Sequence, residues 1–365
     1  MKLKRYAAPA VIALTAALAL SACASNEGGA PAAEGTDSGS TLSGTLTGIG
    51  ASSQGSAQEA WIAAFQTANE GVTINYDPQG SGAGRESFIS GAAAFAGSDS
   101  FLSDEELAGE FGSCVADTGA IDLPVYISPI ALIFNVEGVD TLNLDATTAA
   151  NIFNGSITTW NDPAIAALNP EATLPSANIT AVHRSDDSGT TENFTDYLAQ
   201  NAGDAWGEEA SDTWPFQSGE GAQGTSGVVD AVTNGVNTIG YADASRAGEL
   251  GVAALKVGEE FVDYTPEAAA AVVEGSPRVE GRGDNDIAIE VNRTTTTAGE
   301  YPLVLVSYII ACQEYTDPAS AELVKAYVGY IASDEGQAVA ADAAGIAPLS
   351  PDLSADVAAA IESIK

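Results

Sequence analysis

The stretch "TLTGIGASSQGSAQEAWIAAFQTANEGVTINYDPQGSGAGRESF", residues 45–88, decides the fold class. Apolar residues that alternate with polar ones predict strands at 45–50 and 72–78. Between these strands Trp61 and Phe65 stand one helical turn apart, which predicts a helix that ends before a glycine. Each strand runs into a Gly-rich turn that opens a helix. This order predicts an α/β fold with a largely parallel sheet, in which ligands lie beyond the carboxyl ends of the strands.

The rest of the chain repeats this order and indicates two lobes. Long apolar extended runs at 123–136 and 301–311 bracket a middle segment, in which a further strand is predicted at 286–291. About 320 residues follow the N-terminal region, and a single core rarely grows that large. We therefore predict a two-lobed α/β protein with a discontinuous first domain. Residues 45–125 and 301–365 form the first predicted domain, and residues 126–300 form the second.

The N-terminus has the pattern of an export signal. A basic start and a short apolar run precede "LSAC" at 20–23, which predicts a signal peptide over residues 1–22. The Leu-Ser-Ala-Cys ending resembles a bacterial lipobox, which implies cleavage before Cys23 and a lipid on its sulfur. An ordinary secretory signal is the alternative. Residues 23–44 are rich in Gly, Ala and Ser and predict a flexible tether, so the folded part would stay at the extracytoplasmic face of the cell membrane.

The composition is strongly acidic. The full chain has a formal net charge of −38, and loss of the three basic residues Lys2, Lys4 and Arg5 with the signal changes it to −41. Nucleic-acid binding is not expected, because it requires a basic surface. An anionic ligand remains compatible with this charge, since surface charges are screened beyond about 8–10 Å and backbone N–H groups with one Arg can set the local potential.

Two cysteines remain after the predicted signal, Cys114 and Cys312. In an exported protein an even pair is a candidate disulfide. The alternative is two separate buried thiols.

Four Gly-rich stretches carry hydroxyl or charged residues where a strand leads into a helix. They are "GIGASSQG" at 48–55, "QGSGAG" at 79–84, "GSDS" at 97–100 and "HRSDDSGTT" at 183–191. A helix N-terminus offers free N–H groups, glycine allows close approach, and hydroxyls add donors, so together these turns favour an anion. Arg184 supplies a planar fork for an oxyanion. Alternation along its strand places His183 on the opposite face, so His183 is expected to be a packing residue outside the site.

Asp99 is the unexpected member of these turns, because an anion site should exclude a carboxylate unless that carboxylate has a task. A carboxylate only accepts hydrogen bonds, so it suits a ligand that retains a proton. Phosphate retains one near neutral pH and sulfate does not, so Asp99 would reject sulfate. The alternative is a turn residue ahead of the helix cap at Ser103.

The stretches "TGIGASS", "QGSGAG", "AGSDSFLSDEEL", "HRSDDSGTTENFTDYL" and "IFNGSITTWNDPAIAALNP" resemble the phosphate-binding protein of the phosphate-specific ABC importer. The resemblance runs from about residue 45 to 240 and more loosely to the C-terminus, and it implies the two-lobed fold of periplasmic binding proteins, type II. It implies that phosphate is contacted by Ser52, Ser53, Ser81, Asp99, Arg184, Ser188, Gly189 and Thr190, with Asp186 orienting Arg184. Ser53 departs from the family, which commonly has an aromatic residue there, and this change concerns affinity more than ligand identity.

The resemblance also implies a mechanism and partners. The lobes would close on phosphate about hinge segments near 126–130 and 299–303, and the closed form would dock on an ABC permease with its ATPase subunits. A monomer without a cofactor is expected.

Three other functions are alternatives to this one. Catalysis is not expected, because His183 is the only histidine and no cluster has metal-binding spacing. A receptor for sulfate, molybdate or a phosphonate, or a surface lipoprotein without a transport role, remain the alternatives.

Overall fold

The computed structural model describes residues 42–365. The predicted signal peptide, Cys23 and most of the predicted tether lie outside the described residues. Within the described part of the chain, no helix combines the length and the apolar character needed to cross a membrane.

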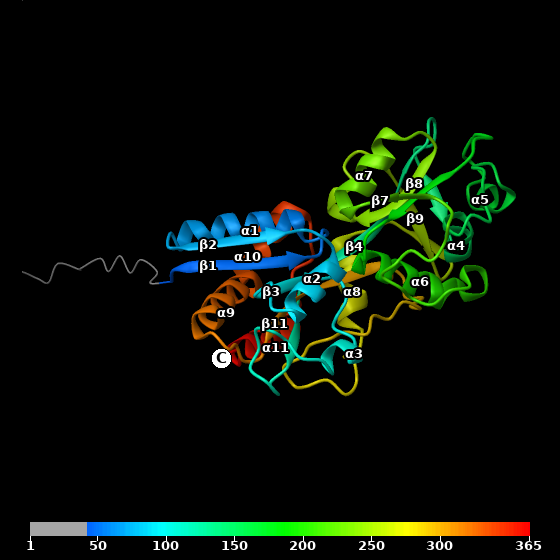
Figure 1. The fold of residues 1–365 in the computed structure, drawn as a ribbon. Coiled ribbons are helices and arrows are strands. Elements are labelled where there is room, and N and C mark those ends of the chain that lie inside the picture. The colour runs from blue at the N-terminus through cyan, green and yellow to red at the C-terminus, as the bar shows by residue number, and fades with distance from the viewer. Residues whose placement is uncertain (1–41) are drawn as a thin grey trace, which may run out of the picture. The chain divides into compact units, whose positions relative to one another are not determined.

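The first lobe begins with the strands and helices that the opening stretch predicts (Figure 1). The elements are β1 (Gly44–Gly50), α1 (Gly55–Ala68), β2 (Val72–Asp77), α2 (Ser81–Ile89), β3 (Phe95–Ser98) and the short α3 (Asp104–Leu107). Strand β1 pairs in parallel with both β2 and β3. Trp61 and Phe65 are buried on the inner face of α1, as their spacing predicts. The local pattern therefore sets the parallel core of this lobe.

Strand β4 (Ala120–Asn135) carries the chain from the first lobe to the second. Up to Pro129 it pairs antiparallel with β11 (Val304–Cys312), and from Ile130 onward it pairs antiparallel with β8 (Thr238–Asp243). The change of partner falls within the segment predicted as a crossover. The sheet order β2-β1-β3-β11-β4-β8-β6-β7 follows from this single long strand.

The second crossover runs beside the first. The backbone N–H of Ile130 donates to the carbonyl of Leu303 at 2.8 Å, and the hydroxyl of Tyr301 donates to the carbonyl of Ile130 at 2.9 Å. The fold is thus the predicted two-lobed α/β fold with a discontinuous first domain. The domain boundaries given above remain a prediction of the sequence.

The second lobe contains a sheet with helices on both faces (Figure 1). Its elements are β5 (Leu142–Leu144), α4 (Ala146–Phe153), α5 (Pro163–Leu168), β6 (Thr180–Arg184), α6 (Gly189–Trp206), β7 (Glu220–Ala222), α7 (Gly224–Asn234), β8, η1 (Ala244–Arg246), β9 (Gly251–Val257) and β10 (Glu260–Val262). Helix α8 (Pro266–Glu274) follows and contacts β4 and β11. Along β4, Ile133 joins a small core with Val228 and Val232 of α7. The next residue, Phe134, joins the large core that also contains Phe153 of α4. This alternation is what a strand covered on both faces requires.

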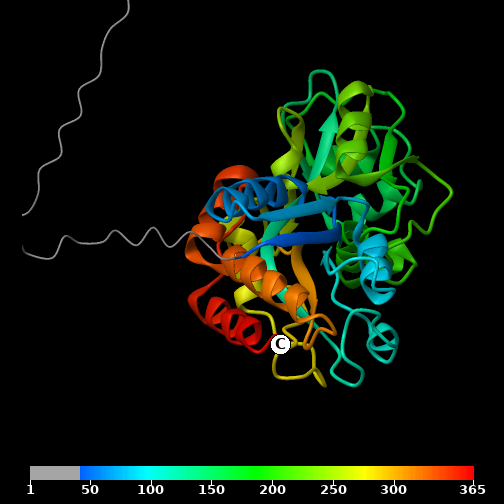
Figure 2. The same cartoon turned by 60° about the vertical axis from the view of Figure 1, so that its left-hand side comes forward.

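The chain returns to the first lobe through β11 and ends in three helices. These are α9 (Pro318–Ala332), α10 (Asp334–Ala344) and α11 (Pro351–Glu362). Phe65 of α1 and Tyr327 of α9 meet edge to face, with ring centroids 5.3 Å apart. Helices α9 and α11 lie side by side near the C-terminus (Figure 2).

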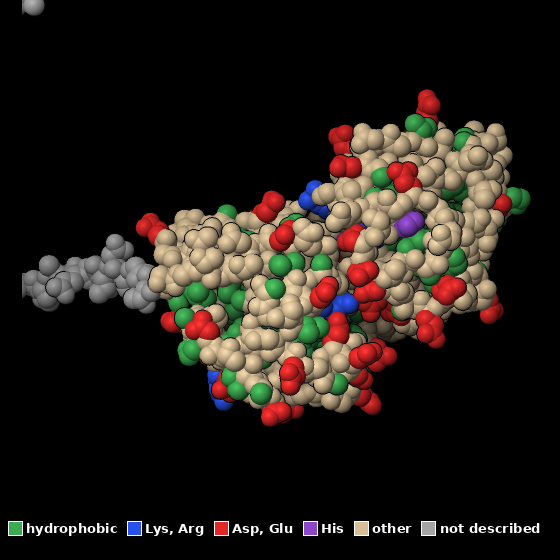
Figure 3. Space-filling view, in the orientation of Figure 1, with side chains coloured by type: hydrophobic (Ala, Val, Ile, Leu, Met, Phe, Trp, Pro, Cys, Tyr) green, Lys and Arg blue, Asp and Glu red, His purple; other side chains and the backbone are tan. Residues whose placement is uncertain are grey.

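The structure contains the predicted Cys114–Cys312 disulfide, which ties the loop after α3 to the end of β11. On the face that Figure 3 shows, acidic side chains are dispersed over both lobes, with few Lys or Arg among them. This distribution agrees with the net charge of −38.

The strand predicted at 286–291 is wrong. That segment forms only an isolated bridge between Arg278 and Ile289. Its donors go to separate partners and form no ladder with one strand: the N–H of Ile287 bonds the carbonyl of Asp122 in β4, and that of Ile289 bonds the side-chain hydroxyl of Tyr308 in β11. Alternating apolar residues indicate that one face of a segment is buried. A strand also needs a neighbouring strand to pair with, and the alternation does not predict one.

Candidate functional site

The turns predicted to bind an anion meet between the two lobes. From the first lobe come the turns after β1, β2 and β3, and from the second comes the turn between β6 and α6. The hydroxyls of Ser53 and Thr190 both donate to the carboxylate of Asp99, at 2.6 and 2.8 Å. The backbone N–H of Asp99 donates to the hydroxyl of Ser81 at 3.1 Å. Residues more than 90 positions apart therefore form one polar centre.

Asp99 is the most heavily bonded member of this centre and is 3% exposed. Its Oδ1 accepts hydrogen bonds from Ser53 and from Ser307, each at 2.6 Å, whereas its Oδ2 accepts one from Thr190. A carboxylate oxygen accepts about two hydrogen bonds, so Oδ2 has room for one further donor. A ligand at this position would have to bring a proton.

Arg184 ends β6 and is 2% exposed. Its Nε donates to Asp186 Oδ1 at 2.8 Å, and its Nη2 donates to Asp186 Oδ2. Burial opposes ionisation of Asp186, but the hydrogen bonds and charge of Arg184 outweigh it and hold the pKa of that carboxyl below its ordinary value. The bidentate pair fixes the plane of the guanidinium and occupies Nε and Nη2.

Helix α6 begins within the site. The hydroxyl of Ser188 accepts the N–H of Thr191 at 3.2 Å, which makes Ser188 the N-cap. The first intrahelical bond runs from Glu192 N to Ser188 O, so the N–H groups of Gly189 and Thr190 precede it. These two amides lie at the positive end of the helix dipole, where an anion is favoured.

Glycines let the two lobes approach this closely. A Cβ on Gly189 would lie 2.8 Å from Ser81 Oγ and 2.8 Å from Asp99 Cβ, both in the first lobe. Gly80 has φ of +113°, and a Cβ there would lie 2.7 Å from Asp186 Oδ2 in the second lobe. The structure is thus a closed arrangement, which larger residues at these positions would prevent.

Ser52 also contacts the opposite lobe, through a residue that sequence reasoning missed. Its hydroxyl accepts the backbone N–H of Thr225 at 3.0 Å and lies 3.0 Å from the hydroxyl of that residue. Thr225 stands at the start of α7 beside Gly224, which has φ of +69°. This start is a fifth Gly-and-hydroxyl turn before a helix, and that signal could have found it.

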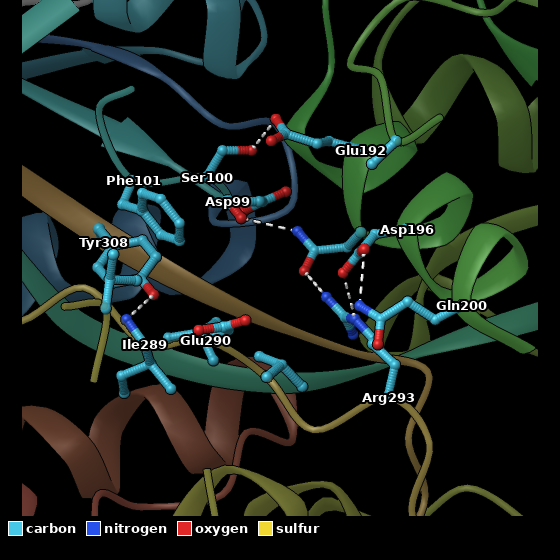
Figure 4. Close-up of a pocket in the computed structure, with 15 residues that line it drawn as sticks. Asp99, Ser100, Phe101, Glu192, Asp196, Gln200, Ile289, Glu290, Arg293 and Tyr308 are labelled. Carbon is cyan, nitrogen blue, oxygen red and sulfur yellow. Dashed lines mark hydrogen bonds and ion pairs between the residues drawn. The ribbon is translucent and has the colours of Figure 1, made fainter. Parts of the chain in front are cut away.

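Ser307 and Asn193 were also missed. Ser307 comes from the middle of β11, where nothing in the local sequence marks it. The side-chain amide of Asn193 donates to the carbonyls of Asp99 and Gly189, at 2.7 and 2.8 Å, and so joins the lobes. Asn193 and Asp99 line a cavity of about 420 Å³ together with Arg293, whose Nη2 donates to Asn193 Oδ1 (Figure 4).

The departure at Ser53 changes the contact itself. Ser53 is 1% exposed and supplies its hydroxyl to Asp99, in addition to any backbone contact. The neighbouring Gln54 is fully buried and donates to Ser307 Oγ at 2.7 Å. Polar side chains therefore fill the place where an aromatic residue was expected.

His183 lies outside the site, as alternation predicts. Its ring stacks on Trp214 with centroids 4.7 Å apart, and its Nδ1 lies 2.8 Å from the carbonyl of Arg184. Partial burial lowers the pKa of His183 despite that hydrogen bond. Among residues 42–365, no group of three or more His, Cys, Asp or Glu side chains is placed to hold a metal ion.

Comparison with known proteins finds one matching superfamily and several similar phosphate-binding proteins. Residues 35–335 match the PBP superfamily domain. Phosphate-binding protein PstS3 of Mycobacterium bovis is 38% identical over 339 residues, which cover 90% of this chain and 90% of that protein. PstS2 of Mycobacterium tuberculosis is 35% identical over 373 residues, which cover 100% of both chains.

Solved structures share the fold. A high-affinity periplasmic phosphate-binding protein, PfluDING, determined with bound phosphate, has a TM-score of 0.67 at 21% identity, covering 87% of this chain and 93% of that one. A phosphate-binding protein from Stenotrophomonas maltophilia has a TM-score of 0.63 at 19% identity, covering 87% and 94%.

Proposed function

The chain belongs to the PBP superfamily and, within it, to the family of the PstS phosphate-binding proteins, and on that premise we propose that it binds inorganic phosphate between its lobes for import. The bound anion would receive hydrogen bonds from the hydroxyls or amides of Ser52, Ser53, Ser81, Ser188, Gly189 and Thr190 and from the guanidinium of Arg184. No step requires a nucleophile or a metal, so the protein acts as a receptor and not as an enzyme.

The observation that carries this proposal is the bonding of Asp99. Three hydroxyl donors occupy three of its acceptor positions, and the remaining one lies on Oδ2. Monoprotonated phosphate can donate its proton there. A fully ionised oxyanion such as sulfate would place an acceptor against an acceptor, which costs affinity.

The family relationship also implies how the bound phosphate would be delivered to the membrane. The closed form would dock on a membrane ABC permease, whose ATPase subunits drive import. A lipid on Cys23 would hold the receptor at the extracytoplasmic face of the membrane as a monomer. Both the lipid site and most of the tether lie outside the described residues, so mass spectrometry of the mature N-terminus is the direct test of this part.

Calorimetric titration of phosphate, with sulfate as the control anion, tests the proposal. The protein is first unfolded and refolded to remove any phosphate carried through purification. We expect tight phosphate binding that excess sulfate does not disturb, and loss of binding in Arg184→Ala. Equal binding of sulfate would remove the role given to Asp99 and leave a general oxyanion receptor. A folded protein that binds neither anion would contradict the transport function and favour a surface lipoprotein on the same fold.

A further inference from the structure

Arg85 of α2 bonds a carboxylate in each lobe. Its Nε donates to Glu106 Oε1 at 2.9 Å, and its Nη2 donates to Asp212 Oδ2 at 3.0 Å. Glu106 belongs to α3 in the first lobe, where it also caps the helix start at Ser103. Asp212 belongs to the segment between α6 and β7 in the second lobe. One guanidinium therefore makes one ion pair within its own lobe and one across the cleft.

The cross-cleft partner is connected directly to the anion-binding turn. The backbone N–H of Ser188 donates to the carbonyl of Asp212 at 2.9 Å. Ser188 is the residue that caps α6 and begins the Gly189–Thr190 pair of amides. A force on Asp212 is thus transmitted through one hydrogen bond to the part of the second lobe that faces the ligand.

A second contact crosses the cleft beside this pair. The hydroxyl of Ser100, next to Asp99, donates to Glu192 in the first turn of α6 at 2.5 Å (Figure 4). Arg85, Glu192 and Asp212 line one hollow between the lobes. The first turn of α6 is therefore held to the first lobe at Glu192 as well.

The lobes can separate at this ion pair without leaving a buried charge unpaired. The Arg85 side chain is 10% exposed, so leaving it without a carboxylate would strand a nearly buried charge. When the lobes part, Glu106 stays with Arg85 in the first lobe and keeps it paired. The Asp212 side chain is already 29% exposed and can regain water. Opening therefore costs one partly exposed ion pair and leaves no orphaned buried charge.

We propose that the Arg85–Asp212 ion pair is a latch that positions the Ser188 turn over the bound anion and slows its release. This inference rests on the proposed phosphate-receptor function. It assigns a positioning role to two side chains that do not themselves belong to the predicted anion contacts.

Stopped-flow measurement of phosphate release from the protein and from Asp212→Asn tests the latch. We expect release roughly 5- to 30-fold faster in Asp212→Asn, since truncating one partner of a cross-interface pair acts mainly on dissociation and this pair is partly exposed. The melting temperature without phosphate should stay close to that of the unaltered protein. Raising the salt concentration should speed release from the unaltered protein more than from Asp212→Asn.

Glu106→Gln is the matched control, because it removes the other carboxylate of the same arginine and keeps a side chain that can cap α3. It should lower the melting temperature and should not speed phosphate release, because opening the lobes would then leave Arg85 without a carboxylate. Arg85→Gln combined with Asp212→Asn should release phosphate no faster than Arg85→Gln alone, because the two side chains act as one pair.

The outcomes separate the two proposals. If the unaltered protein binds no phosphate, the proposed function fails and the latch fails with it. If it binds phosphate and Asp212→Asn releases it at the same rate, only the latch is overturned. Faster release in Asp212→Asn that persists unchanged in the Arg85→Gln background, or an equal effect of Glu106→Gln, would also overturn it.

Discussion

A single glycine sets how far the lobes can close. Gly189 begins α6, and its missing side chain makes room for Asp99, Ser81 and Ser100 of the first lobe. These contacts exist only when the lobes meet, because Gly189 stands on the opposite lobe from all three. Ligand affinity and fold stability should therefore respond differently to a change at this position.

Gly189→Ala should weaken phosphate binding roughly 10- to 100-fold, because the added methyl overpacks the closed cleft at a cost of about 1–3 kcal/mol. Its melting temperature without phosphate should not fall, since alanine is a better helix former than glycine. Gly203→Ala is the matched control in the same helix, because a Cβ there meets no atom within 4 Å. Calorimetric titration and thermal melting of both variants give the comparison. Unchanged phosphate affinity in Gly189→Ala would argue against closure in the geometry described.

At the scale of the elements, the pairing of β4 with β8 buries a carboxylic acid, Asp243, where the chain crosses between the lobes. Asp243 ends β8 opposite Ile130 and is fully buried. It accepts hydrogen bonds from Ser245 N at 3.0 Å and from the hydroxyl of Tyr126 at 3.0 Å. Burial raises the pKa of Asp243 to about 6, although these donors oppose the shift.

This raised pKa predicts a pH dependence of stability. The folded state binds the Asp243 proton more tightly than the unfolded state, so the stabilisation is fully present below the ordinary pKa near 3.8 and is lost as pH rises through about 6. Asp243→Asn stays neutral and avoids this loss. The free energy of unfolding of the variant, relative to the unaltered protein, should rise by on the order of 2 kcal/mol between about pH 4 and pH 7.5. Denaturant unfolding at several pH values measures the difference, and a difference that does not vary with pH would refute the prediction.

The sequence predicted those elements whose signals are local. The spacing of Trp61 and Phe65 and the Gly-rich turns lie within a few residues of one another, so β1, α1 and α2 could be predicted, as could the disulfide pairing of two remaining cysteines. Ser307 could not, because it reaches Asp99 only through a pairing 208 residues apart. The turn at Thr225 carries a local signal, but its contact with Ser52, 173 residues away, is not local. The contact roles of the predicted site residues toward phosphate remain a prediction that titration must test.

At the scale of the whole molecule, one disulfide connects two distant parts of the chain. The Cys114–Cys312 disulfide joins residues 198 positions apart, and the ring that it forms contains the entire second lobe. Both cysteines belong to the first lobe and lie outside the predicted hinge segments.

Replacing both cysteines with alanine should lower the free energy of unfolding by about 2–5 kcal/mol, because a large loop is released in the unfolded chain. Phosphate affinity should change less than about twofold, since the link does not cross the cleft. Equilibrium denaturation under non-reducing conditions measures the first quantity, and calorimetry measures the second. A large loss of affinity with little loss of stability would place the link in the closing mechanism instead.

The position of β11 between β3 and β4 has a consequence for how the chain is made. A ribosome delivers residues 44–135 first, yet the sheet of the first lobe lacks a central strand until residues 304–312 arrive. Strands β3 and β4 then present unpaired edges, which are prone to join other chains. The second lobe, by contrast, has all of its strands once residue 262 has emerged. Assembly should therefore run from the inserted lobe outward, and the first lobe to be synthesised should be the last to be completed.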